Sequence, residues 1–164
     1  MADGNDSYIA RIVENISDIS ARDWDGLIGN KNPFVSHAFL SALEETGCAT
    51  EQTGWLPHHL IIQDETSKII AASPLYIKSH SQGEYVFDHG WAHAWEQAGG
   101  NYYPKMQVSI PFSPVTGPRL LANKKNSIDK LNKIIKNETN ILVGTQLISK
   151  GFHFPSLNCI VVVD

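Results

Sequence analysis

Apolar and polar positions alternate along this 164-residue chain in patterns that predict strands separated by helices. Residues 8–19 fit either a helix or a strand, and the alternation favours a strand over 9–13. Apolar runs at 60–62 and 69–72 flank a polar turn, which predicts a hairpin. The second hairpin strand is expected to continue past Pro74 with an edge or a bulge there, because proline cannot donate a ladder hydrogen bond.

The remaining strand signals lie further along the chain. Alternation and apolar runs predict strands at four places: 84–87, 106–112, 140–144 and 158–164. The last two are rich in Ile and Val, which is typical of a buried sheet.

Helix signals separate these strands. Ser20 precedes an acidic helical turn at 23–27, and Ser36 is a good N-cap for a helix that Gly47 ends. Further helices are predicted over 91–98 and, after Ser127, over 127–138. The order of elements predicts a mixed α/β (α+β) single domain, with helices flanking one mostly antiparallel central sheet.

Charge divides the chain unevenly. The formal net charge is −4, but residues 1–122 hold seven basic and fourteen acidic residues, whereas 123–164 hold six basic and three acidic. Lys, Asn and Ile also become more frequent after residue 122. This shift predicts a boundary near 122–126, between a first segment (1–122) and a second one (123–164).

Several classes of protein are disfavoured by composition. The acidic balance gives no general case for nucleic-acid binding. Cys48 and Cys159 have no zinc-ligand spacing, so no metal is expected. The chain has no apolar run long enough for a membrane span and begins with acidic and polar residues, so a cytoplasmic protein is expected.

Candidate catalytic residues follow the strand predicted over 84–87. Asp88 could orient His89, and His89 could then deprotonate an amine during acyl transfer. Alternatively, Asp88 caps the next helix and His89 is simply exposed. The two interpretations of Asp88 and His89 are compatible.

Candidate binding residues come next in the chain. Trp91, Tyr102, Tyr103 and Lys105 could line a groove for a sugar-peptide or aminoacyl substrate, although packing and a surface lysine would also explain them. A second group offers a flexible backbone and a positive charge for a phosphate or carboxylate, unless it is only a turn: Thr116, Gly117 and Arg119.

Residues 9–122 resemble a known family. The stretches 32–40, 76–91, 102–105 and 112–121 are similar, nearly position for position, to FemAB-like, GNAT-related predicted N-acyltransferases of the peptidoglycan-biosynthesis type. The resemblance implies a protein of two GNAT-like halves, of which this chain would hold the first, truncated half. It also implies an acyl donor such as acyl-CoA and an amine acceptor.

Residues 131–164 resemble a different protein. The segments 144–146, 150–151 and 153–155 are similar to the primosomal helicase PriA, so the chain looks like a chimera. Four residues could contact DNA under this alternative: Thr145, Gln146, Lys150 and Gly151. No phosphate-binding loop of the type G-x-x-x-x-G-K-[ST] is present, so ATPase activity is not expected.

The sequence therefore predicts a truncated acyltransferase-like lobe with a helicase-like tail. The alternatives are a non-catalytic interaction module, which could self-associate through an exposed sheet edge, and a helicase fragment with nucleic-acid contacts only. The helix and strands expected in the second segment could also complete the sheet of the first.

Overall fold

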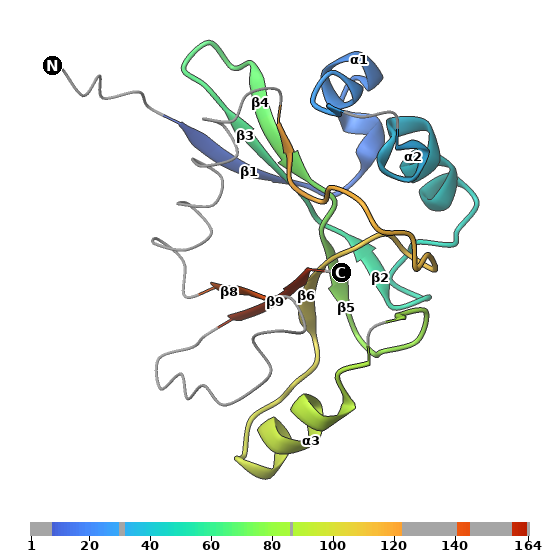
Figure 1. Cartoon of the computed structure of the whole chain (residues 1–164), viewed down its shortest axis with the longest axis vertical. Helices are drawn as coiled ribbons and strands as arrows, with labels where there is room; N and C mark the ends of the chain where they lie inside the picture. Colours follow the sequence, from blue (N-terminus) through green and yellow to red (C-terminus); the bar gives the residue numbers. More distant parts are fainter. Residues whose placement is uncertain (1–7, 30–31, 86, 123–140, 145–158, 164) are drawn as a thin grey trace, which may run out of the picture.

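The structure, a computed structural model, describes residues 8–29, 32–85, 87–122, 141–144 and 159–163, with side chains placed as far as residue 122. Its strands form two sheets (Figure 1). The first sheet has the order β1-β3-β4-β7, all antiparallel, with the bounds β1 Ile9–Val13, β3 His59–Gln63, β4 Ile69–Ser73 and β7 Leu121–Ala122.

The second sheet has the order β2-β5-β6-β9-β8. Its first three strands pair antiparallel and its last three pair parallel. Its bounds are β2 Trp55–Pro57, β5 Tyr76–Lys78, β6 Lys105–Val108, β8 Ile141–Gly144 and β9 Cys159–Val163. The mixed α/β prediction with mostly antiparallel pairing is confirmed, but two sheets replace the single sheet expected.

One antiparallel ladder joins the two sheets. Leu60 pairs with Ser73 in the first sheet, and Pro57 pairs with Tyr76 in the second, in the same register. Between them, the His58 amide donates to the Leu75 carbonyl at 2.8 Å. The ladder breaks at Pro74, as predicted, because proline has no N–H to donate. The pairs β3–β4 and β2–β5 therefore share one antiparallel register, which passes from the first sheet to the second at Pro74.

Two short helices cover one face of the first sheet. They are α1 (Ala21–Asp25) and α2 (His37–Glu45), with the 3-10 turns η1 (Ile16–Asp18) and η2 (Pro33–Val35) beside them. The predicted Ser36 cap is confirmed, since its hydroxyl accepts from the Phe39 amide, and the Ser20 hydroxyl caps α1 by accepting from the Asp23 amide. Trp24 is fully buried beneath them, and its indole donates to the Val35 carbonyl at 2.8 Å.

The third helix is placed differently. Helix α3 (His89–Gln97) lies at the opposite end of the molecule from α1 and α2, beyond β5 and β6 (Figure 1). None of its residues is buried. The predicted helix over 91–98 is confirmed, and Gly99, with a φ of +86°, follows its C-cap residue Ala98.

The strand predicted over 84–87 is wrong for the residues described there. The Glu84 amide donates to the Ser81 carbonyl within a turn, and no neighbouring strand pairs with this segment. The alternation that suggested a strand has another origin: Glu84 is buried, whereas Tyr85 and Phe87 are exposed.

The strands predicted near 140–144 and 158–164 are confirmed as β8 and β9. β9 pairs in parallel with β6, so the second segment contributes strands to the same sheet as the first. The helix predicted over 127–138 lies outside the described residues, and the boundary near 122 stays a prediction. So does self-association through a sheet edge. Within the described ranges, no helix has the length and apolar character needed to cross a membrane.

Candidate functional site

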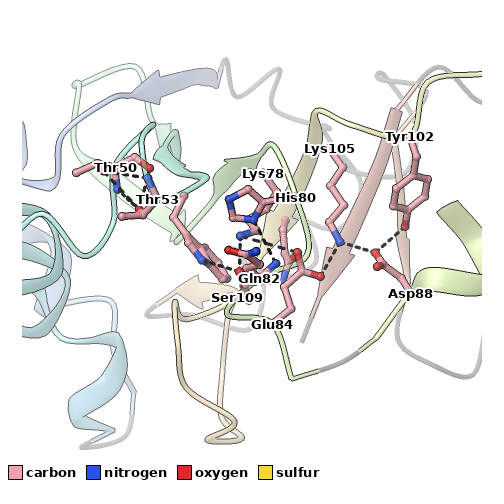
Figure 2. A network of polar contacts seen from close by, with 12 residues as sticks. Thr50, Thr53, Lys78, His80, Gln82, Glu84, Asp88, Tyr102, Lys105 and Ser109 are labelled. Carbon is pink, nitrogen blue, oxygen red and sulfur yellow. Dashed lines mark hydrogen bonds and ion pairs between the residues drawn. The ribbon is translucent and has the colours of Figure 1, made fainter.

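Charged side chains are buried together on the second sheet, next to α3. The ammonium of Lys105 donates to Glu84 Oε2 at 2.7 Å and to Asp88 Oδ2, and the Tyr102 hydroxyl donates to the same Asp88 oxygen at 2.7 Å (Figure 2). Lys78 lies beside them, with its Nζ 4.0 Å from Glu84 Oε1. All five residues are buried, and we call them the ammonium cluster: Lys78, Glu84, Asp88, Tyr102 and Lys105.

The sheet register brings the two lysines together. Lys78 on β5 and Lys105 on β6 are direct cross-strand partners, so their side chains lie on the same face. The loop after β5 supplies Glu84, and the residue before α3 supplies Asp88. Two ammonium groups therefore face two carboxylates, a balance that makes their burial tolerable.

Lys78 has the weaker set of partners of the two lysines. It is fully buried, and its Nζ lies 3.6 Å from the centre of the Trp55 ring. Besides its long contact with Glu84, it donates to the Gln82 carbonyl at 3.0 Å. Burial lowers the pKa of Lys78 to about 8; the carboxylate of Glu84 opposes this shift, and the charge of Lys105 adds to it.

The carboxylates keep part of their capacity to accept hydrogen bonds. Burial raises the pKa of Glu84, and the hydrogen bond from Lys105 partly offsets this rise. Burial also raises the pKa of Tyr102, with a further rise from its hydrogen bond to Asp88. Within the described residues, the buried oxygens Glu84 Oε1 and Asp88 Oδ1 have no hydrogen-bond donor. Each could accept an N–H from another group.

Three of the residues singled out in the sequence meet in this cluster: Asp88, Tyr102 and Lys105. A fourth, Tyr103, lies at its rim, with its ring centre 5.6 Å from Lys105 Nζ and 5.2 Å from the centre of the Tyr102 ring. Both rings thus face the Lys105 ammonium, which suits the binding of a cation.

His89 is not oriented by Asp88 in the way the sequence suggested. The Asp88 carboxylate is directed to Lys105 and Tyr102, and the exposed His89 ring stacks on Phe87 with centres 5.6 Å apart. The alternative, that Asp88 caps the next helix and His89 is simply exposed, is only half correct. Asp88 is the N-cap residue of α3, but its side chain makes no capping hydrogen bond. Trp91 lies on α3 and is 41% exposed.

The candidate phosphate-binding residues belong to another part of the fold. They lie in the loop that leads into β7 of the first sheet, whereas the ammonium cluster is built on the second. Thr116 and Gly117 are exposed, and the buried Arg119 donates to the Val115 carbonyl at 2.5 Å. The candidate DNA-contacting residues lie outside the described residues: Thr145, Gln146, Lys150 and Gly151.

Sequence reasoning missed Lys78 and Glu84. The available signal was the alternation in the strand: Lys78 is two residues after Tyr76, so it shares the face of a residue that is fully buried. In the described part of the chain, no three His, Cys, Asp or Glu side chains gather in a way that could hold a metal ion.

Comparison with protein families matches residues 15–160 to the FemAB-like family, which is described as peptidoglycan biosynthesis/recognition. The match runs continuously through 122–126, so it gives no support to a chimera or to a helicase segment. Searches among curated proteins and among solved structures return no match, and the relation to the GNAT fold stays a prediction. Since the matched range covers most of its length, this chain belongs to the FemAB-like family.

Proposed function

We propose that this chain binds the amine of a peptidoglycan precursor and takes part in the transfer of an acyl or aminoacyl group to it. The observation that carries the proposal is the environment of the Lys105 ammonium, which two carboxylates and two phenol rings surround. These are the groups that bind an amine well. Glu84 Oε1 and Asp88 Oδ1, which accept no hydrogen bond from the described residues, offer acceptors for the N–H groups of a substrate amine.

Acyl transfer to an amine needs a base near this place. The amine nitrogen attacks the acyl carbonyl carbon, a C–N bond forms, the bond to the leaving group breaks, and a proton leaves the nitrogen. His89 is exposed at the start of α3, directly after Asp88 in the chain. Its imidazole is the proposed acceptor of that proton.

Acyl-CoA is the proposed donor, with its phosphates near Thr116 and Gly117. Both residues are exposed in their loop. Arg119 orders this loop from within by donating to the Val115 carbonyl. A thermal-shift titration with acetyl-CoA, at fixed salt and protein concentration, is expected to give a saturable rise in Tm. A cooperative unfolding transition whose Tm does not change with acetyl-CoA would contradict this part of the proposal.

Calorimetric titration with a lysine-containing peptidoglycan stem peptide tests the amine site. The same peptide acetylated on its lysine, which has no ammonium, is expected to bind at least about tenfold more weakly, because the loss of a charge-assisted hydrogen bond costs more than about 1.4 kcal/mol. Asp88→Asn should weaken binding of the free amine similarly. Asp64→Asn, in the exposed hairpin turn, is the matched control. Equal binding of the two peptides would rule out the amine site.

A second candidate function is recognition of peptidoglycan without transfer. Four aromatic residues are exposed within the short segment that carries Asp88: Tyr85, Phe87, Trp91 and Trp95. Exposed aromatic side chains grouped in one segment are typical of a binding surface. Under this alternative, the protein co-sediments with peptidoglycan, loses that binding in Trp91→Ala, and transfers no acyl group. Loss of acyl transfer in His89→Ala, with binding intact, would favour the enzyme.

A further inference from the structure

The loop that joins β5 to Glu84 is held in place at one backbone carbonyl. Gln82 O accepts two hydrogen bonds, from Lys78 Nζ at 3.0 Å and from the Trp55 indole at 3.2 Å. The next residue, Gly83, has a φ of +78°. A Cβ there would lie 2.5 Å from the Phe112 ring and 2.9 Å from the Trp55 indole nitrogen, so only glycine fits. The loop is therefore held closely over Trp55 and Lys78.

The fold gains little stability from Lys78. Lys105 donates to two carboxylates, whereas Lys78 has one carbonyl, one aromatic ring and a carboxylate oxygen at 4.0 Å. Desolvating an ammonium with so few partners is costly, and an apolar side chain of similar volume is often no worse for stability. A buried lysine under these conditions is better explained by what it does for the site.

We propose that Lys78 is a positioning residue: it fastens residues 79–84 through the Gln82 carbonyl and so places Glu84 against Lys105. Glu84 follows Gln82 by two residues, and its carboxylate lies between the two lysines (Figure 2). With Glu84 in place, Lys105 is held on one side and remains directed to Asp88 on the other. This inference rests on the proposed function, because it concerns the geometry of the same amine site.

The arrangement makes the loop sensitive to pH. The groups that face Lys78 are the carboxylates of Glu84 and Asp88, the ammonium of Lys105, the Trp55 ring and the Gln82 carbonyl. Because the pKa of Lys78 is lowered to about 8, it is charged at pH 7 and mostly neutral at pH 9. Opening of the loop would return Lys78 to water, where its pKa rises towards the ordinary value of 10.5, so the open loop binds the proton more tightly than the closed loop. Above pH 8, where Lys78 in the closed loop has lost its proton, the loop should therefore open less readily.

Amide hydrogen exchange of the peptide covering 79–88 tests the proposal. At pH 7, Lys78→Met is expected to exchange at least about tenfold faster than the parent in this peptide and at the parent's rate in β3 and β4. Lys68→Met, at an exposed lysine of the hairpin, is the matched control and should change nothing in 79–88. After correction for intrinsic rates, the parent should gain protection between pH 7 and 9, whereas Lys78→Met should show no such step.

Parent-like exchange in Lys78→Met would overturn the proposal. Faster exchange throughout the protein would overturn it too, since it would mean a general loss of stability. If Lys78→Met does not fold, Trp55→Phe removes the indole donor to Gln82 and keeps an aromatic ring beside Lys78, and it should speed exchange in the same peptide while keeping the pH step. If the proposed function is wrong, the parent protein will not bind the amine peptide. The exchange experiment does not depend on that binding, so the two failures can be distinguished.

Discussion

Two buried groups of charged and polar side chains serve different ends in this molecule. Glu44 on α2 uses both of its oxygens: Oε1 accepts from His59 Nε2 at 2.8 Å, and Oε2 accepts from the Ile16 amide at 2.9 Å. His59 is fully buried, with edge contacts to the Trp24 and Tyr76 rings. In the ammonium cluster, by contrast, Glu84 and Asp88 each keep a buried oxygen without a donor among the described residues.

The difference separates a structural tie from a candidate site. The Glu44 carboxylate joins α2 to η1 and β3, and each of its oxygens already accepts a hydrogen bond, although His59 Nδ1 has no hydrogen-bond partner among the described residues. The ammonium cluster instead gathers four buried charged groups, and two of its carboxylate oxygens accept no hydrogen bond from the described residues, next to a helix with no buried residue. Several buried charges gathered in one place, with lowered or raised pKa values, make a candidate functional site. The following predictions test this contrast.

Lys105→Met should have the largest effect on stability. It leaves Glu84 and Asp88 buried with only the distant Lys78 as a counter-charge, and breaking a buried ion pair costs about 3–5 kcal/mol. The free energy of unfolding from urea titration measures this loss, with Lys68→Met as the exposed control. Adding Asp88→Asn to Lys105→Met should recover part of it, because the charges that remain, those of Glu84 and Lys78, then balance. A loss below about 1 kcal/mol in Lys105→Met would show that the cluster is hydrated.

Glu44→Ala should cost about 2–4 kcal/mol, because both His59 and the Ile16 amide lose their acceptor in a buried place. The neighbouring Glu45→Ala removes an exposed carboxylate from the same helix and should change the free energy of unfolding by no more than about 0.5 kcal/mol. Binding of the amine peptide should be the same in both variants. If Glu44→Ala loses binding of the amine peptide at a temperature where the variant is folded, Glu44 is not a purely structural residue and the contrast between the two regions fails.

Lys78→Met should change how stability depends on pH. The folded pKa of about 8 lies below the ordinary value of 10.5, so the unfolded chain binds the proton more tightly. The parent therefore gains stability relative to Lys78→Met as pH rises from 8 to 10.5, by up to about 3 kcal/mol. At pH 7 the variant should be at least as stable as the parent. Parallel stability curves for the two proteins, from urea titrations at several pH values, would contradict a buried charged Lys78.

Trp91→Ala should have the smallest effect on stability, less than about 1 kcal/mol, because Trp91 is 41% exposed on a helix with no buried residue. Its effect on peptidoglycan binding should be larger if the aromatic residues of 85–95 form a contact surface. Co-sedimentation with peptidoglycan measures this. Unchanged binding together with a large loss of stability would place α3 in the core and not at a binding surface.

Local features of this fold could be predicted from the sequence, and features that depend on distant partners could not. The strand at 9–13, the Ser36 cap and the hairpin after residue 59 follow from side chains only a few positions apart. The break at Pro74 was also predictable, since it depends on one missing N–H. The division into two sheets was not, because it depends on which strands pair on either side of that break.

The candidate site shows the same limit. Asp88, Tyr102 and Lys105 were named from the sequence, but their contacts with one another were not. Asp88 was expected to face its neighbour His89, and instead it reaches Lys105, 17 positions away. Lys78 and Glu84 were missed because a charged residue in a strand normally faces solvent. Only the pairing of β5 with β6 shows that Lys78 lies beside Lys105 on a buried face.

The parallel pairing of β9 with β6 has a practical consequence for anyone who divides the gene. β6 begins at Lys105, and β9 comes from the far end of the chain. A shortened protein that stops at residue 122 would leave one side of β6 as an open edge, ready to pair with another chain. Such a protein is expected to aggregate on expression, and a failed assay of it would say nothing about the chemistry of Lys105.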